Sequence, residues 1–540
     1  MDIAANQNVP SLLRQQVATN PDKVFLVHED DAGDVADLTY GDFAGKVNRL
    51  ANHLAARGIL RGQTIAVMLS NCPEFLQSWF AINQIGAVMV PVNVLYSPDE
   101  LAYLLTDADC AGLVTEPAFL AKYRSIEGDC PAVKVRILAR TRTPEPGFDL
   151  AVTIDETGVA DWRAVAIAPG DPSQIIYTSG TTSRPKGAIL GHHGSVTQGI
   201  ALAQHFGLNR NTRTCVVLPL FHVNGQFVGV IPALTVGGTV VLLQSYSASR
   251  YWSQVRRHRC TFISIVPMIL RTLLAQPPLA TDAQHDVTTA FYALPTSDAE
   301  WTAFEGRFGV RLIEGYGLSE TFGICTANPV IHGRSKRHCI GLPILGRQVR
   351  VADEVGADLP AGQSGGIVVR GAPVFTGYHR NDAATQACMQ DGWLITGDNG
   401  WFDADGYLHF LDRSKDVIKR AGENIAAGEV ERVLSEHPAV AECAVIGVFD
   451  PLRDEAVKAV VVLHAGCAVT DTDLMGWCAR SLAKFKVPTL IEYRDALPKT
   501  SIGKIMKYQL RADHAAANLA PGTGLAGQNA QTPGDADGTT

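Results

Sequence analysis

The chain has 540 residues, and its 46 lysines and arginines against 54 aspartates and glutamates give a net charge of −8, which argues against a nucleic-acid-coating protein. Hydrophobic content of 46% and charged content of 19% are typical of globular proteins, and the length exceeds what one core can serve, so we expect several domains. Eleven cysteines without a C-x-x-C pair, a non-basic N-terminus and no membrane-length apolar run predict a cytoplasmic protein that neither spans a membrane nor depends on disulfides.

The first part of the chain alternates between helix and strand patterns. Thr39 followed by Asp42 predicts a capped helix start, because a hydroxyl and a carboxylate at this spacing satisfy free backbone donors. The run at 64–69 (TIAVML) predicts a buried strand, the apolar spacing over 75–82 a helix, and the run at 87–90 another strand. Such alternation predicts layers of α/β structure around a largely parallel sheet.

Residues 175–187 read IIYTSGTTSRPKG and are the most informative stretch of the chain. A short apolar strand enters a glycine- and hydroxyl-rich loop that closes with Lys186. Small residues let backbone N–H groups approach an anion, and hydroxyls and a lysine add donors, so the loop suits a nucleotide phosphate. It is not a Walker A motif, because Pro185 stands at the second glycine position and Gly187 at the Ser/Thr position.

Four further motifs follow: LPLFHVNG at 218–225, EGYGLSET at 314–321, LITGD at 394–398 and PKTSIGKI at 498–505. Each has an ordinary structural explanation when taken alone. A histidine after an apolar strand is usually a core residue, an aspartate near an arginine is usually an ion pair, and a lysine in a glycine-containing loop is usually a solvated charge. Their joint occurrence and order favour a functional interpretation.

The C-terminal part of the chain has a different pattern of predicted elements. From about residue 340, short strands such as 366–370 separated by Gly, Pro and Asp turns predict a small β-rich subdomain. After Asp412 the pattern predicts a small α+β domain. Its elements are expected to be a helix, two strands and a helix at 428–435, 444–448, 456–463 and 473–482. The end of the chain is rich in Ala, Gly, Pro and Asp and is expected to be disordered.

These motifs together resemble the adenylate-forming superfamily, which includes acyl-CoA synthetases, carrier-loading adenylation domains and luciferases. The stretches 246–274 and 304–312 are most similar to the carnitine/crotonobetaine–CoA ligase branch. The resemblance implies an α/β fold with a large N-terminal domain, 1–414, made of layered α/β subdomains and a small β-rich subdomain. A small mobile α+β domain, 415–512, and a disordered tail, 513–540, are expected to follow.

The resemblance also implies ATP, Mg²⁺ and CoA as ligands and assigns roles to the motif residues. Glu320 is expected to hold Mg²⁺, Lys504 to contact the reacting carboxylate and α-phosphate, and His222 to position groups beside the acyl chain. Tyr316 is expected to stack on adenine, and Asp398 to accept from the ribose hydroxyls. The complete expected nucleotide-binding set is Thr178, Ser179, Gly180, Thr181, Thr182, Lys186, Gly315, Tyr316, Gly317, Ser319, Asp398 and Arg413.

Two positions in the small domain have implied conformational roles. Lys415 stands at the family's hinge, and Gly422 belongs to the face that meets CoA, where a missing side chain would let the pantetheine arm pass. One segment departs from the family pattern. Residues 291–296 read FYALPT where relatives carry a Gly/Ala-rich segment next to adenine, so no adenine-edge residue is assigned there.

The predicted function is that of an AMP-forming acyl-CoA synthetase, an acid–thiol ligase. It would convert a carboxylic acid and MgATP to acyl-AMP and pyrophosphate and then transfer the acyl group to CoA. The pocket segments 221–227 and 321–326 are mostly apolar, which favours a hydrophobic or ring-bearing acid over a carnitine- or betaine-type acid. Loading of a carrier protein in place of free CoA is a second alternative.

A non-catalytic nucleotide-binding module is a third alternative. Such a module would have lost residues that carry the chemistry. All of them are present in this chain, namely Glu320, Asp398, Arg413 and Lys504.

Overall fold

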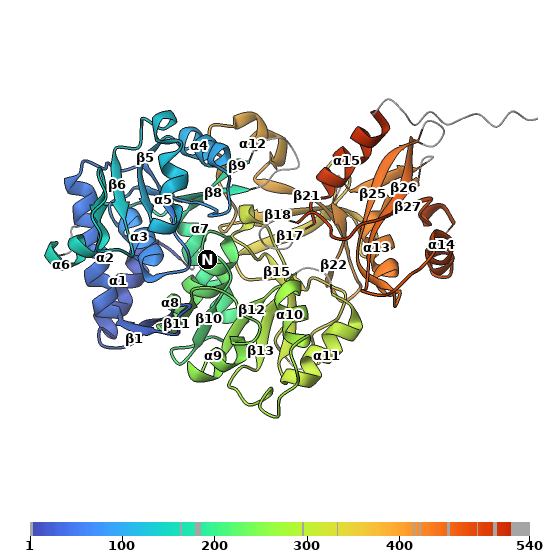
Figure 1. Cartoon of the computed structure of the whole chain (residues 1–540), viewed down its shortest axis with the longest axis horizontal. Coiled ribbons are helices and arrows are strands. Elements are labelled where there is room, and N and C mark those ends of the chain that lie inside the picture. The colour runs from blue at the N-terminus through green and yellow to red at the C-terminus, as the bar shows by residue number, and fades with distance from the viewer. Residues whose placement is uncertain are drawn as a thin grey trace, which may run out of the picture. The chain divides into compact units, whose positions relative to one another are not determined.

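The computed structural model divides into two compact units, 1–415 and 416–540 (Figure 1). No helix that the structure describes is long and apolar enough to cross a membrane. The described residues are 4–161, 165–178, 185–293, 296–331, 333–413, 416–420, 423–450, 454–482, 484–499 and 505–519.

The first unit is built on two large sheets. The nine-stranded sheet is parallel except at β2, β15 and β16. Its order is β16 (Leu342–Pro343), β15 (Thr326–Ala327), β14 (Arg311–Tyr316), β13 (Thr289–Tyr292), β12 (Phe262–Ile265), β10 (Arg213–Val216), β11 (Thr239–Leu243), β1 (Val24–Glu29) and β2 (Val35–Thr39).

The eight-stranded sheet is parallel except for β9 and β19, which form an antiparallel edge beside β8. This edge carries the glycine- and hydroxyl-rich loop. The order is β19 (Gly377–Tyr378), β9 (Lys186–Gly191), β8 (Pro172–Thr178), β4 (Val88–Pro91), β3 (Thr64–Met68), β5 (Cys110–Thr115), β6 (Val135–Leu138) and β7 (Asp149–Leu150).

Helices fill the space between the two sheets and cover their outer faces. In β3, Ile65 and Val67 face the middle helices, whereas Ala66 and Met68 face α4 and α5, as the alternation of a strand requires. The middle helices are α1 (Val9–Thr19), α2 (Tyr40–Ala56), α3 (Pro73–Gln84), α7 (His192–His205) and α8 (Ile231–Thr235). The outer helices are α4 (Pro98–Asp107), α5 (Pro117–Arg124), α9 (Tyr251–Arg257), α10 (Pro267–Leu274) and α11 (Asp298–Phe308).

The predicted elements of the first unit are confirmed. Thr39 caps α2: its hydroxyl accepts from the Asp42 N–H at 3.0 Å, and Asp42 Oδ2 accepts from the Thr39 N–H at 3.2 Å. The predicted strands and helix between residues 64 and 90 correspond to β3, α3 and β4.

The predicted β-rich part of the first unit is an antiparallel sheet with short connections. Its strands are β17 (Arg347–Ala352), β18 (Gly365–Gly371), β21 (Trp393–Phe402), β20 (Met389–Gln390) and β22 (Leu408–Arg413). Shorter elements of the unit are α6 (Ala151–Thr157), α12 (Asp382–Cys388), the 3-10 turns η1 (Glu127–Asp129) and η3 (Ser319–Thr321), and the π-helix η2 (Asn224–Val230).

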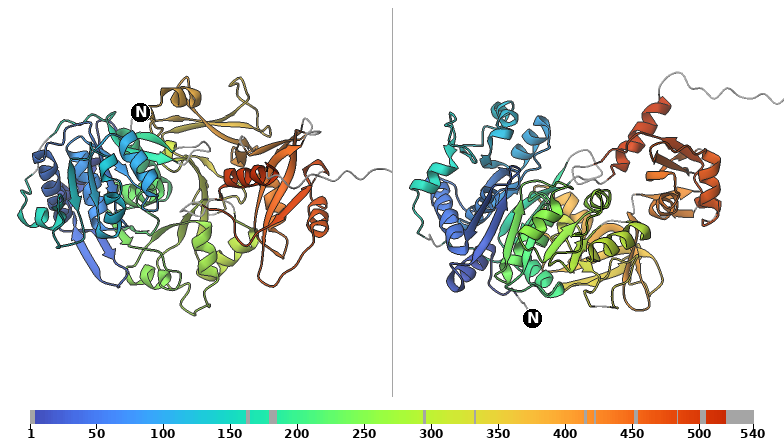
Figure 2. Two further views of the ribbon diagram at one scale, coloured as in Figure 1. Left: turned by 45° about the horizontal axis from the view of Figure 1, so that its top comes forward. Right: turned by 60° about the horizontal axis from the view of Figure 1, so that its bottom comes forward.

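The second unit is a five-stranded sheet with helices on both faces (Figure 2). α13 and α14 pack on one face, and α15 contributes Leu510 to the apolar cluster on the other face. The strands are β24 (Glu423–Ala426), β23 (Val417–Arg420), β26 (Asp454–Leu463), β25 (Val440–Asp450) and β27 (Leu490–Tyr493). The helices are α13 (Ala427–Ser435), α14 (Asp471–Ala479), the 3-10 turn η4 (Lys484–Lys486) and α15 (Lys507–Leu519).

The sequence predicted disorder from residue 513 onwards, but the structure places residues 513–519 in a helix. α15 continues past residue 513 to Leu519, because the helix is tied to the sheet. Arg494 donates to Asp513 at 2.8 Å, and Lys458 Nζ lies 2.8 Å from His514 Nδ1. Residues 520–540 lie outside the described part of the chain.

Candidate active site

The candidate phosphate loop joins β8 and β9 at the antiparallel edge of the eight-stranded sheet. Thr178 and Lys186 are register partners where the loop begins and ends. Close packing favours glycine at position 187, because a Cβ there would lie 2.6 Å from Ile175 Cγ2. The hairpin therefore fixes both ends of the loop. Four residues predicted to bind phosphate lie outside the described part of the chain, namely Ser179, Gly180, Thr181 and Thr182.

Glu320 and Lys186, predicted from different motifs, are linked by one tyrosine. The Tyr378 hydroxyl donates to Glu320 Oε1 at 2.7 Å, and Lys186 Nζ lies 5.2 Å from the centroid of the Tyr378 ring. Tyr378 comes from β19, and sequence reasoning missed it because a Gly-Tyr pair between turn residues carries no chemical signal of its own. We refer to Lys186, Glu320 and Tyr378 as the Glu320 corner.

Tyr316 and Asp398 also meet, although the two motifs are far apart in the chain. The Tyr316 hydroxyl donates to Asp398 Oδ2 at 2.5 Å, and Asp398 is only 2% exposed. Burial, followed by the Asp398 charge, raises the pKa of Tyr316, so the phenol stays a donor at neutral pH. Arg413 is the register partner of Asp398 in the β21–β22 pair, and its side chain lies outside the described part.

The glycines of the EGYG motif are required by the protein's own packing. A Cβ at Gly315 would lie 2.7 Å from the Thr326 carbonyl oxygen, and one at Gly317 would lie 2.5 Å from the Gly323 carbonyl oxygen. The backbone of this motif is thus pressed against the returning chain. Ser319, the next predicted residue, begins the η3 turn that carries Glu320.

His222 lies in a largely apolar turn, and burial lowers its pKa to about 4. The imidazole is therefore neutral at physiological pH, and its buried Nε2 has no hydrogen-bond partner among the described residues. Its ring lies 4.6 Å from that of Phe221, centroid to centroid. A neutral ring with a free nitrogen suits the positioning role that we predicted. We refer to residues 217–223 as the His222 turn.

Asn71 holds the His222 turn in place and was missed by sequence reasoning. Its amide oxygen accepts from the Leu220 N–H at 2.9 Å, and its NH₂ lies 3.2 Å from the Leu218 carbonyl oxygen and 3.3 Å from that of Leu243. Asn71 is 6% exposed, so losing these partners would leave a buried amide unsatisfied. A polar residue three positions after the end of the buried strand β3 was the available signal.

The candidate acyl-pocket segments contribute more to the core than expected. Phe227 and Phe322 are fully buried with ring centroids 5.2 Å apart, and Trp79 packs against Phe227 at 6.0 Å. Half-buried side chains in the first segment are those of His222, Val223 and Asn224. The two phenylalanines thus stabilise the layer between the sheets.

Three predicted residues near or within the second unit lie outside the described part of the chain. They are the proposed hinge Lys415, the CoA-side Gly422 and the adenylation lysine Lys504.

Comparison with known families identifies the chain. The AMP-binding enzyme model matches residues 13–379, and the AMP-binding enzyme C-terminal domain model matches residues 429–504. The chain belongs to the AMP-binding enzyme family. The resemblance of the motifs to the adenylate-forming superfamily is therefore confirmed.

Curated relatives of this AMP-binding enzyme extend over nearly the whole chain. The crotonobetaine/carnitine–CoA ligase of Salmonella paratyphi C is 36% identical over 524 residues, which cover 95% of this chain and 100% of the relative. The ligase of the same name from Salmonella typhi is also 36% identical over the same shares. Together with the family match, these relatives make the chain an AMP-forming acyl-CoA ligase.

Solved structures of CoA ligases share the fold. The anthranilate CoA ligase AuaEII, in complex with anthranoyl-AMP, superposes with a TM-score of 0.87 at 27% identity, covering 96% of this chain and 99% of that chain. ATP-bound MatB from Rhodopseudomonas palustris superposes with a TM-score of 0.85 at 29% identity, covering 94% and 99%. The predicted α/β fold with a large N-terminal and a small C-terminal domain is confirmed.

The first residue of the EGYG motif, Glu314, is a carboxyl with a shifted pKa. Burial raises the pKa of Glu314 to about 8, so the group is mostly protonated at neutral pH. Glu314 is the register partner of Tyr292 at the end of β13, and the buried Tyr292 hydroxyl faces the Thr296 side chain. The segment that departs from the family pattern therefore carries polar side chains here; its residues 294 and 295 lie outside the described part.

Glu320 fits the expected magnesium ion. Tyr378 occupies one carboxylate oxygen, and no donor among the described residues reaches the other. No group of three or more His, Cys, Asp or Glu side chains suited to a metal occurs among the described residues. Mg²⁺ commonly binds through one or two carboxylates together with substrate phosphates, so a single acid is an adequate protein ligand.

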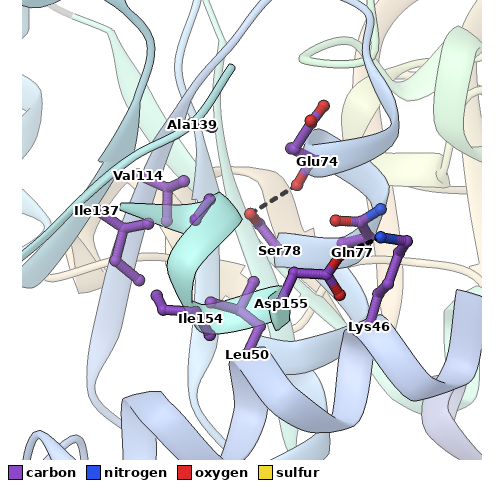
Figure 3. Close-up of a pocket in the computed structure, with 11 residues that line it drawn as sticks. Lys46, Leu50, Glu74, Gln77, Ser78, Val114, Ile137, Ala139, Ile154 and Asp155 are labelled. Atoms are coloured by element: carbon purple, nitrogen blue, oxygen red, sulfur yellow. Dashed lines mark hydrogen bonds and ion pairs between the residues drawn. The ribbon is translucent and has the colours of Figure 1, made fainter. Parts of the chain in front are cut away.

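A small pocket in the first unit is separate from these residues (Figure 3). Its volume is about 20 Å³, enough for a water molecule. Lys46 pairs with Asp155 at its rim, and the Ser78 hydroxyl donates to the Glu74 carbonyl oxygen at 2.7 Å. The pocket lies between α2, α3 and α6 and the strands β5 and β6, and it is too small for a carboxylic acid.

Proposed function

We propose that this acyl-CoA ligase activates a small acid of the carnitine or crotonobetaine class. The observation that carries this choice is the likeness to ligases of that name, at 36% identity over the full length of the relative. The burial of Phe227 and Phe322 agrees with it, because these rings are in the core and do not offer an open surface to an aromatic acid.

The ligase reaction has two substitution steps. In the first, a carboxylate oxygen attacks the α-phosphorus of ATP, the bond to the β-phosphate oxygen breaks, and pyrophosphate leaves. In the second, the CoA sulfur attacks the acyl carbonyl carbon of acyl-AMP, AMP leaves, and the thiol proton is released. The first step brings two anions together, so its transition state needs fixed positive charge and donors.

The Glu320 corner would meet that need on the phosphate side. Lys186 would contact phosphate from the end of the β8–β9 loop, and Glu320 would hold Mg²⁺. When bound, Mg²⁺ would neutralise charge on the pyrophosphate group as it leaves. Tyr316 and Asp398 would bind the adenosine, with Asp398 accepting from the ribose.

The second unit would contribute Lys504, Lys415 and Gly422. Lys504 would neutralise charge between the carboxylate and the α-phosphate during adenylation. Lys415 would permit the small domain to turn between the two steps, and Gly422 would leave room for the pantetheine arm. His222 would lie beside the acyl end of the substrate, with its ring packed against that of Phe221.

A ring-bearing or hydrophobic acid is the second candidate. It is favoured by the likeness to the anthranilate CoA ligase, at 27% identity, and by the lack of a carboxylate side chain in segments 221–227 and 321–326 that could pair with a quaternary ammonium group.

A panel of acids would decide between the two candidates. Acid-dependent pyrophosphate release would be measured with crotonobetaine, carnitine, crotonate, butyrate, benzoate and anthranilate, each with and without CoA. Preference for crotonobetaine over crotonate, which lacks the trimethylammonium group, would support the first candidate. Preference for benzoate or anthranilate would replace it with the second.

The same assay would identify the acyl acceptor. We propose free CoA, as the names of the relatives state for those proteins. The enzyme is expected to form the acyl-CoA thioester when free CoA is supplied at a saturating concentration. Acyl transfer to a purified carrier protein, without transfer to CoA, would contradict this assignment.

A further inference from the structure

Tyr378 lies on β19, a two-residue strand at the edge of the eight-stranded sheet. Gly377 pairs with Ile189 and Tyr378 with Ala188, so β19 runs beside β9, the strand that begins with Lys186. The His379 N–H also donates to the Gly187 carbonyl oxygen at 2.7 Å. The backbone around Tyr378 is therefore fixed to the base of the candidate phosphate loop.

The same segment is tied to Glu320 in two independent ways. The Tyr378 hydroxyl donates to Glu320 Oε1 at 2.7 Å, and the Phe375 N–H donates to the Glu320 carbonyl oxygen at 2.8 Å. One bond orients the carboxylate and the other fixes the backbone that carries it. A hydrogen bond from a neutral donor to a carboxylate is stronger than one between neutral groups.

The aromatic ring of Tyr378 has its own contacts. Lys186 Nζ lies 5.2 Å from the ring centroid, within the range of a cation–π interaction, and the Phe375 ring packs in a T-shaped arrangement with its centroid 4.9 Å away. The Thr385 hydroxyl accepts from the Tyr378 N–H at 2.8 Å.

We propose that Tyr378 is a positioning residue that sets the Glu320 carboxylate and the Lys186 ammonium for MgATP. Its hydroxyl holds one oxygen of Glu320 and leaves the other for the metal ion, while its ring keeps Lys186 beside the phosphate loop. The hydroxyl and the ring thus have separable effects. The proposal rests on the metal role of Glu320 and the phosphate role of Lys186 in the proposed function.

Two substitutions would separate these effects. Tyr378→Phe keeps the ring and removes the hydroxyl, whereas Tyr378→Leu removes both. Tyr40→Phe is the matched control, because the fully buried Tyr40 hydroxyl donates to the Gly238 carbonyl oxygen at 2.8 Å, away from the Glu320 corner. Binding of Mn²⁺ to the full chain would be followed by electron paramagnetic resonance with α,β-methylene ATP, which cannot transfer its adenylyl group to an acid.

Tyr378→Phe is expected to weaken Mn²⁺ binding about 10- to 100-fold, the usual effect of removing a group that orients a metal-ligating carboxylate. Its binding of the nucleotide analogue without metal should equal that of the wild type. Tyr378→Leu should weaken both. Tyr40→Phe should lower the melting temperature without changing either affinity.

Glu320→Gln distinguishes failure of this proposal from failure of the proposed function. If Glu320→Gln weakens Mn²⁺ binding but both Tyr378 variants bind Mn²⁺ like the wild type, the positioning role of Tyr378 is wrong. If Glu320→Gln also binds Mn²⁺ like the wild type, the metal role of Glu320 is wrong, and the proposal fails with it. Circular dichroism melts of every variant confirm that the folded protein is being compared.

Discussion

The Glu320 corner and the His222 turn lie in the same unit but are held by different forces. In the Glu320 corner, side chains distant in the sequence are joined by a hydrogen bond and a cation–π contact. The His222 turn is held by two buried amides, those of Asn71 and Gln226, and by packing of apolar neighbours. Charged ligands require oriented polar groups, whereas an acyl chain requires a shape. Several sequence motifs therefore predict the phosphate side, whereas on the acyl side the LPLFHVNG motif predicts His222 but not the shape of the pocket.

The largest expected effect is on the packing beside the His222 turn. Phe227→Ala would leave a cavity between Trp79 and Phe322, and such truncations cost about 3–5 kcal/mol of unfolding free energy. Because Phe227 does not contact the Glu320 corner, the nucleotide affinity of the folded variant should stay near that of the wild type. Denaturant unfolding and calorimetric nucleotide titration would measure the two quantities.

Phe449→Ala is the control, since that phenylalanine is 83% exposed and its truncation should cost little. Equal loss of stability in both variants would contradict the assignment of Phe227 to the core. Loss of nucleotide affinity in folded Phe227→Ala would show that the packing beside the His222 turn and the Glu320 corner are not independent.

Removal of the proposed adenylation lysine should act on the phosphate side alone. Lys504→Ala is expected to lower acid-dependent pyrophosphate exchange about 100- to 1,000-fold, because a preorganised charge is lost where two anions react. Conversion of supplied acyl-AMP to acyl-CoA should continue. Lys499→Ala, which removes a nearby lysine paired with Glu442 at 2.5 Å, is the control and should retain both activities.

The proposed hinge should show the opposite pattern. Lys415→Pro fixes one backbone dihedral angle between the two units, so adenylation should persist while thioester formation falls by about tenfold or more. Adenylation and thioester formation would each be assayed in both variants, Lys415→Pro and Lys504→Ala. Equal loss of both steps in both folded variants would show that the two lysines do not divide the reaction in this way.

Glu314 tests whether the carboxyl that begins the EGYG motif affects stability. Its pKa is about 8 in the fold against 4.5 for the ordinary group, so the unfolded chain releases this proton first as the pH rises. The folded state is therefore progressively destabilised between about pH 4.5 and pH 8. Glu314→Gln removes the ionisable carboxyl and with it this pH-dependent destabilisation. The variant should therefore be more stable than the wild type by a few kcal/mol at pH 8 but by little at pH 4.

Thermal melts from pH 4 to pH 8 would measure the Glu314 effect. The exposed Glu354→Gln variant serves as the control. A constant difference between Glu314→Gln and wild type over this range would mean that Glu314 ionises in the folded protein as it does in the unfolded chain.

The smallest expected effect concerns the end of the chain. A chain stopped after Leu519 should match the wild type in activity and melting temperature. A chain stopped after Ala512 loses the contacts of Asp513 with Arg494 and of His514 with Lys458, which should destabilise the second unit by about 1 kcal/mol. Identical melting of the two truncated chains would show that the last part of α15 contributes nothing.

Local patterns predicted most of the layered fold. The Thr39 cap, the buried strands and the change of texture near residue 340 are short-range signals, and the corresponding elements α2, β3, β4 and β16–β22 are present. The end of the second unit was predicted less well. Its composition suggested disorder after residue 512, but two side-chain contacts to the sheet extend α15 to Leu519.

The candidate site was predictable only where motifs carry its residues. Tyr316 and Asp398 were both assigned to the nucleotide site, and the structure brings them together. Tyr378 and Asn71 escaped notice because their partners, Glu320 and Leu220, lie 58 and 149 residues away in the chain. Tyr378 reaches Glu320 because β19 pairs with β9, and Asn71 reaches Leu220 because the two sheets come together beyond the end of β3.

The central claim is that this acyl-CoA ligase forms an acyl-adenylate before CoA takes part. The most direct test is exchange of labelled pyrophosphate into ATP in the absence of CoA, with the best acid of the panel. The account predicts exchange that requires acid and Mg²⁺, proceeds without CoA and is lost in Lys504→Ala. Exchange that begins only when CoA is added would contradict it.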